Sequence, residues 1–142
     1  MDQLYQERIL GYAKAVRQTT ELSDATHHAM ISNPTCGDRV EVRLRMESGN
    51  VAAVSTTVRG CALCEAGAGL LLELAPGLPA SDVASLGDDL AKWLAGDEAI
   101  DIPDAMTAFA PVRVIRNRHK CVTLAFDAGK VALADRNDGR PE

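Results

Sequence analysis

Alternating apolar and charged positions are clearest in residues 40–47, where every second side chain is hydrophobic. A period of two is typical of a β-strand with one face in the core and the other in water. Residues 51–59 follow a turn at 48–50 and are rich in residues that favour extended structure. We therefore predict an antiparallel hairpin here, with residues 27–32 as a weaker candidate for a further strand.

Helical spacing dominates the rest of the chain. In residues 2–17, apolar side chains recur every three or four positions, which is typical of a helix with one buried face. The other predicted helices are 62–75, 81–95, a shorter one that starts at 103 and ends at Pro111, and 119–134. Residues 112–117 are predicted to be a connector between the last two helices.

These elements predict an α+β fold, in which a small antiparallel three-stranded sheet is packed by an N-terminal helix and several C-terminal helices. At 142 residues the chain is expected to form one domain, which we place at residues 1–134. The polar residues 135–142 are expected to be a disordered tail.

The composition narrows the class of function and the compartment. A net charge of −5 argues against nucleic acid as the main partner, because phosphate binding needs a basic face. Residues 1–7 lack the basic and apolar regions of a secretion signal, and the apolar stretch 66–75 is too short to span a bilayer. Four cysteines in such a chain indicate metal binding or thiol chemistry in a reducing compartment. We therefore expect a cytoplasmic protein with no membrane partner.

The candidate chemistry starts in a turn at residues 33–38, where Cys36 and Asp38 lie two positions apart. Cys61 lies at a predicted strand-to-helix junction, and Cys121 lies at a predicted helix start. If the end of the sheet and both helix starts lie together, Cys36, Asp38, Cys61 and Cys121 form one tetrahedral metal site. The alternative is three separate buried cysteines, because their spacing matches no short zinc-finger pattern.

A run of basic residues precedes the last of these cysteines. The positive end of the predicted helix, together with Arg116, Arg118 and Lys120, is expected to lower the pKa of the Cys121 thiol. The same run, with Arg113 and Arg116, is interpreted either as a solvated face or as a docking surface for an acidic partner.

Cys61 and Cys64 form a C-x-x-C pair at the start of a predicted helix, a spacing that also occurs in thioredoxin-like redox proteins. The preceding strand belongs to a hairpin rather than to a βαβ unit, which argues against that assignment. Cys64 is therefore interpreted as a small packing residue or as an auxiliary thiol. His119 lies two positions from Cys121 and is expected on the surface rather than among the metal ligands.

Three motifs carry a resemblance to a known family: Asn33-Pro34-Thr35-Cys36-Gly37-Asp38-Arg39, Gly60-Cys61 and Arg118-His119-Lys120-Cys121. With them, the chain resembles the NifU-like/IscU family of iron–sulfur cluster assembly proteins over residues 4–132. The order of helix, sheet and helices also matches that family's α+β fold, the SufE/NifU-like fold. IscU-type scaffolds carry a histidine directly before the third cysteine, whereas this chain has Lys120 there. Together with the extra segment around residues 76–100, this looks like the SufU branch.

The resemblance implies zinc held by Cys36, Asp38, Cys61 and Cys121. It also implies a cysteine desulfurase of the SufS type as partner, which hands over persulfide sulfur, and downstream iron–sulfur assembly proteins. The predicted function is then that of a sulfur acceptor or scaffold rather than of an enzyme that turns over independently. The alternative function is an IscU-type scaffold that builds a [2Fe–2S] cluster on the same residues. A dithiol oxidoreductase that uses Cys61 and Cys64 is less favoured.

Cys36 is the predicted sulfur acceptor. It lies in a turn next to Gly37, so its release from a metal distorts little regular structure. The other two thiols lie at predicted helix starts, where packing restricts movement. Cys121 is the rival acceptor, because Arg118 and Lys120 would stabilise its free thiolate.

Overall fold

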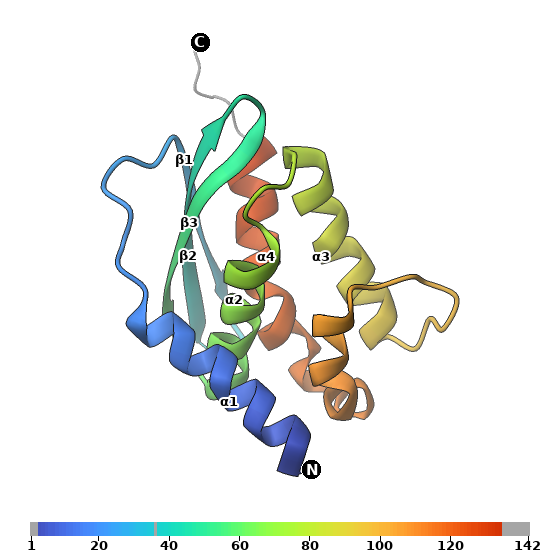
Figure 1. The fold of residues 1–142 in the computed structure, drawn as a ribbon. Coiled ribbons are helices and arrows are strands. Elements are labelled where there is room, and N and C mark those ends of the chain that lie inside the picture. The colour runs from blue at the N-terminus through green and yellow to red at the C-terminus, as the bar shows by residue number, and fades with distance from the viewer. Residues whose placement is uncertain (1–2, 36, 135–142) are drawn as a thin grey trace.

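The structure of the protein, a computed structural model, describes residues 3–35 and 37–134. Its elements, in chain order, are α1 (Gln3–Gln18), β1 (His27–Asn33), β2 (Asp38–Glu47), β3 (Asn50–Arg59), α2 (Ala62–Leu74), α3 (Ala80–Leu94), the 3-10 helices η1 (Asp104–Val114) and η2 (Arg116–Arg118), and α4 (His119–Ala134) (Figure 1). Two sequence predictions, the acceptor Cys36 and the tail 135–142, lie outside the described residues.

The three strands form one antiparallel sheet in the order β1-β2-β3. The loop between β1 and β2 is short, because Asn33 and Asp38 already face each other across the two strands. Gly37 closes this loop: its N–H donates to the carbonyl of Asn33 at 2.8 Å, and its φ of +74° is one that glycine adopts without strain. Ser48 and Gly49 form the turn between β2 and β3. The predicted α+β fold is confirmed.

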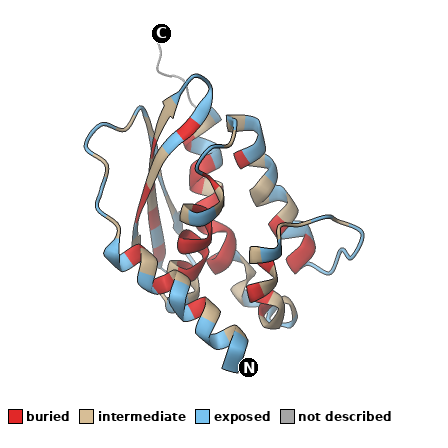
Figure 2. Cartoon of the chain, in the orientation of Figure 1, coloured by how far each residue is buried: buried red, intermediate tan, exposed pale blue. Residues whose placement is uncertain are grey.

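Helices cover one face of the sheet. α4 packs against β1 and β2, α2 packs against β3, and α1 and α3 lie outside these two helices (Figure 1). Because side chains alternate along a strand, Val40, Val42 and Leu44 of β2 all enter the core on this side. Buried residues concentrate between the sheet, α2 and α4, while the outward sides of α1 and α3 are exposed (Figure 2).

The middle of α2 approaches two other helices at backbone distance. A Cβ atom added to Gly69 would collide with the carbonyl oxygen of Tyr12 in α1, and one added to Gly67 would collide with the carbonyl oxygen of Val122 in α4. Glycine at both positions therefore lets α1 and α4 close on opposite sides of α2. This packing holds the starts of α2 and α4 next to the end of the sheet.

The segment before α4 differs from the prediction. A short helix was expected to end at Pro111, but η1 continues through this residue to Val114. Phe109 and Val112, on either side of the proline, are both fully buried, so tertiary packing overrides the local stop signal. The expected connector is largely helical as well, because η2 follows at once. Within the described part of the chain, no helix has the length and apolar character needed to cross a membrane.

Candidate metal centre

Three side chains of the predicted site meet at one end of the sheet. Asp38 is the first residue of β2, Cys61 directly precedes α2, and Cys121 lies in the first turn of α4. One carboxylate oxygen and the two sulfur atoms all lie within 4.8 Å of one another. Asp38 is 4 % exposed and Cys121 is 1 % exposed, whereas Cys61 is half-buried. The structure thus brings together residues that are up to 83 positions apart.

The carboxylate of Asp38 connects the other two residues. Its Oδ1 atom accepts a hydrogen bond from the backbone N–H of Cys61 at 3.3 Å. Its Oδ2 atom accepts one from the thiol of Cys121, also at 3.3 Å. These two bonds hold the carboxylate between the start of α2 and the start of α4. Burying a carboxylate without hydrogen-bond partners is costly, and these two hydrogen bonds offset part of that cost.

Gly60 makes room for this carboxylate, a role that was not predicted from the sequence. A Cβ atom at Gly60 would lie 2.5 Å from Oδ1 and 2.9 Å from Cγ of Asp38. A side chain at this position would therefore displace the carboxylate. The only signal in the sequence was the pairing of Gly60 with Cys61 in the motif, which gave no reason for the glycine.

The Cys121 thiol holds its proton more tightly than an ordinary cysteine. Burial raises its pKa most, and the hydrogen bond to Asp38 and the neighbouring Cys61 raise it further. The prediction that the basic run lowers this pKa is therefore wrong for the metal-free chain. Lys120 does not offset the burial, because its ammonium group forms an ion pair with Asp127 at 3.0 Å. Arg118 lies in η2 at the mouth of the site.

The three donors fit zinc by their chemistry and by their spacing. In a tetrahedral zinc site with bonds of about 2.0–2.3 Å, donor atoms lie about 3.5–3.8 Å apart. The observed spacing of up to 4.8 Å, with 3.3 Å between Cys121 Sγ and Asp38 Oδ2, needs only small movements to reach this geometry. A divalent cation would also displace the thiol proton, since thiolates are the metal-binding form. Cys36, the fourth predicted ligand, lies outside the described residues.

Cys64, Arg118 and Lys120, the remaining predicted residues, are not among the donors of the cluster. Cys64 is 0 % exposed and is not among the three donors that lie within 4.8 Å of one another. Arg118 and Lys120 line a pocket of about 480 Å³ that extends to Cys121 and to Thr35. Both side chains thus border the entrance to the cluster.

His119, the first residue of α4, and Arg113 of η1 have roles that differ from their predicted ones. His119, expected on the surface, is half-buried, and its Nε2 atom lies 3.0 Å from the carbonyl oxygen of Val112 and 2.9 Å from that of Arg113. Since both partners are acceptors, Nε2 carries the hydrogen and ties η1 to the start of α4. Arg113 stacks on Trp93 at 4.7 Å and pairs with Glu98 at 2.9 Å. It therefore stabilises the helical layer and is not free to form a docking surface.

Comparison with known protein families identifies the family to which the chain belongs. The sequence profile of the NifU-like N terminal domain matches residues 4–137. The chain belongs to this family. The resemblance drawn from the three motifs, to the NifU-like/IscU family, is thereby confirmed.

Relatives in the family carry two different names. The chain is 30% identical to the iron-sulfur cluster assembly scaffold protein IscU of Thermotoga maritima, with 92% of each chain covered. It is 27% identical to the zinc-dependent sulfurtransferase SufU of Bacillus subtilis, with 98% of this chain and 95% of that one covered. Among solved structures, the N-terminal NifU-like protein of Brucella abortus superimposes with a TM-score of 0.80 at 28% identity, with 92% of each chain covered.

Proposed function

We propose that this protein is a SufU-like iron–sulfur cluster assembly protein, which holds zinc and accepts sulfur from the persulfide of a cysteine desulfurase. The observation that carries the proposal is the cluster of Asp38, Cys61 and Cys121, whose donor atoms lie within 4.8 Å of one another and in which Asp38 and Cys121 are buried. The names of the relatives, an iron–sulfur scaffold and a zinc-dependent sulfurtransferase, support the same assignment.

Cys36, Asp38, Cys61 and Cys121 would hold the zinc, which keeps bound thiolates deprotonated yet shielded. For sulfur transfer, one thiolate of this chain attacks the outer sulfur of the donor's persulfide. A new S–S bond forms on this chain, the S–S bond of the donor breaks, and the donor cysteine leaves as a thiolate. The exchange is balanced and needs no further oxidant or reductant.

Cys36 is the proposed acceptor. The described thiols are poorly placed for attack on a partner's persulfide, since Cys121 is 1 % exposed and Cys64 is 0 % exposed. Cys61 is half-buried and directly precedes α2, so its movement would disturb the helix start. In the chain, Cys36 falls between the paired residues Asn33 and Asp38, in the connection between two strands, and such connections often carry functional residues.

A second candidate function is that of a scaffold on which a [2Fe–2S] cluster is built. It is favoured by the relative that is 30% identical and is named IscU. The same donors serve this function, because thiolates are the usual ligands of iron–sulfur clusters. In this case the cluster is cargo that the protein assembles and releases. Dithiol redox chemistry is disfavoured, because Cys64 is buried away from solvent.

Metal analysis of protein purified without chelator separates these functions. Zinc near one equivalent per chain, with no acid-labile sulfide, supports the zinc-holding acceptor, and iron with sulfide supports the scaffold. Asp38→Ala, Cys61→Ser and Cys121→Ser should each weaken zinc retention. Cys64→Ser is the matched control and should retain the metal. If all three variants held zinc as tightly as the parent, the shared site would be wrong.

Sulfur acceptance is tested directly with a SufS-type desulfurase and cysteine. After the reaction, mass spectrometry of the alkylated protein locates the persulfide. We expect the additional sulfur on Cys36 and no acceptance by Cys36→Ser. Additional sulfur on Cys121, with acceptance by Cys36→Ser at the parent rate, would overturn the assignment.

A further inference from the structure

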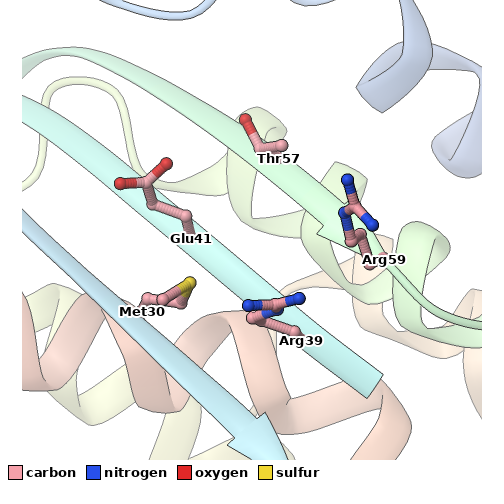
Figure 3. A pocket seen from close by; sticks show the side chains of 5 residues that line it. All are labelled: Met30, Arg39, Glu41, Thr57 and Arg59. Carbon is pink, nitrogen blue, oxygen red and sulfur yellow. The ribbon is translucent and has the colours of Figure 1, made fainter. Parts of the chain in front are cut away.

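The face of the sheet that points away from the helices has an open half. There, a pocket of about 300 Å³ is lined by five side chains from all three strands: Met30, Arg39, Glu41, Thr57 and Arg59 (Figure 3). In Figure 3 these side chains rise from the strands on the side opposite the helices. Met30 is 58 % exposed and lines this pocket together with the two guanidinium groups.

The other half of this face is covered and its charges are paired. The segment 19–26 crosses it: Leu22 accepts a hydrogen bond from Arg43 Nε at 2.9 Å and donates one to Ser55 Oγ at 3.0 Å. Arg43 also forms ion pairs with Glu41 at 3.4 Å and with Glu21 at 3.6 Å. Further along β2, Arg45 pairs with Asp24 at 3.0 Å and with Glu47 at 2.9 Å. Both arginines in the covered half are thus neutralised within the chain.

The two arginines of the open half are not neutralised by ion pairs among the described residues. Arg39 and Arg59 are direct cross-strand partners on β2 and β3, and both are exposed. Within residues 3–35 and 37–134, neither forms an ion pair, and the adjacent Glu41 is already paired with Arg43. Like charges directly opposite each other in a sheet are destabilising. The chain has a net charge of −5, yet it carries this local pair of positive charges, which does not stabilise the fold.

The pair lies at the same end of the sheet as the candidate metal centre. Arg39 follows Asp38 in the chain, and Arg59 precedes Cys61 by two residues. Successive side chains on a strand point to opposite faces, so Asp38 faces the helices and Arg39 faces the open side. A protein that reaches the thiols around this end of the sheet would pass directly over the two guanidinium groups.

We propose that Arg39, Arg59 and Met30 form a docking site for an acidic segment of the sulfur-donating protein. The inference rests on the proposed function for the identity of that partner. Guanidinium groups match carboxylates in fork geometry, and a flexible methionine packs against the aliphatic parts of the incoming segment. The negative net charge disfavours an extended polyanion, such as nucleic acid or an anionic membrane, whereas one short acidic segment needs only a local positive pair.

The test compares variants of equal charge change. Arg39→Glu and Arg59→Glu reverse the charge inside the site. Lys14→Glu makes the same change on α1, where Lys14 is exposed and, among the described residues, forms no ion pair. We expect the first two variants to fold, because each replaces a repulsion between two cross-strand arginines by an attraction. Zinc content and thermal unfolding are measured for every variant.

Sulfur transfer from a SufS-type desulfurase is then followed at increasing concentrations of this protein. For Arg39→Glu and Arg59→Glu we expect the KM for this protein to rise by about tenfold or more, while kcat stays within about twofold of the parent value. Exposed charges at the edge of an interface act mainly on the encounter and docking of the two proteins. Lys14→Glu should stay within about twofold of the parent. Raising the salt concentration should increase the KM of the parent but not that of the double variant Arg39→Glu/Arg59→Glu, because salt screens exposed charges.

Several results would overturn the inference. An unchanged KM, or an equal rise in Lys14→Glu, would show that the arginines have no local role. A loss of zinc in the arginine variants would place Arg39 and Arg59 in the metal centre instead.

If the parent accepts no sulfur at all, the proposed function fails, and docking is judged by the binding of a fluorescein-labelled hexaglutamate peptide. Binding of the peptide to the parent but not to Arg39→Glu supports docking, and Arg39-dependent binding of single-stranded DNA or anionic vesicles instead of the peptide refutes it.

Discussion

Replacing Gly60 by alanine tests whether the position of one carboxylate determines metal affinity. The added Cβ atom would lie 2.5 Å from Asp38 Oδ1, which is about 0.9 Å closer than ordinary van der Waals contact. The carboxylate must move by a similar amount, and its hydrogen bond from the backbone N–H of Cys61 is already long at 3.3 Å. Functional groups need to be held to about 0.5 Å, so this movement exceeds what a metal site tolerates.

We expect zinc affinity to fall by about 10- to 100-fold in Gly60→Ala, the range found when groups that orient metal ligands are lost. This corresponds to about 1.4–2.7 kcal/mol of binding free energy. The metal-free protein should also lose about 1–3 kcal/mol of unfolding free energy, as in other overpacked sites. Competition with a chromophoric chelator measures the affinity, and denaturant unfolding in EDTA measures the stability.

Two controls isolate the cause. Gly11→Ala adds a methyl group on α1, where nothing lies within 4 Å, and should leave both measurements at or slightly above the parent values. A double-mutant cycle with Asp38→Ala asks whether the effect acts through the carboxylate. If it does, Gly60→Ala costs little more in the Asp38→Ala background. Full zinc affinity in Gly60→Ala, or an equal loss in both backgrounds, would refute the reasoning.

Three further outcomes are expected. Gly69→Ala should destabilise the protein by about 1–3 kcal/mol in denaturant unfolding, because its Cβ atom meets the backbone of Tyr12, whereas Gly11→Ala should not. The metal-free protein should lose stability as the pH rises above 9.0, the ordinary pKa of a cysteine thiol. The folded state raises the pKa of Cys121, so it is stabilised relative to the unfolded chain only while this thiol stays protonated. In Cys121→Ala the free energy of unfolding should depend less on pH. Cys64→Ala should lower the melting temperature, because it leaves a small cavity, yet retain the full zinc content of the parent.

Local patterns in the sequence determined most of the secondary structure and the family. The alternation in residues 40–47 depends only on which side chains face the core, and the structure places β2 there with Val40, Val42 and Leu44 buried. Gly37 and Gly49 marked the two turns, because few other residues adopt their positive φ angles. The same local motifs identified the residues Asp38, Cys61 and Cys121 as candidates. Such features involve neighbours in the chain, and for that reason they can be inferred without coordinates.

Tertiary structure alone decided the properties that depend on neighbours far apart in the chain. Burial between β2 and α4, rather than the adjacent basic run, sets the pKa of Cys121. Gly60 owes its role to the carboxylate of Asp38, 22 positions earlier, and the pairing of Arg39 with Arg59 exists only because β2 and β3 have this register. Steric contact and electrostatic interaction act over a few ångströms in space, so a sequence shows them only after the fold has brought the partners together.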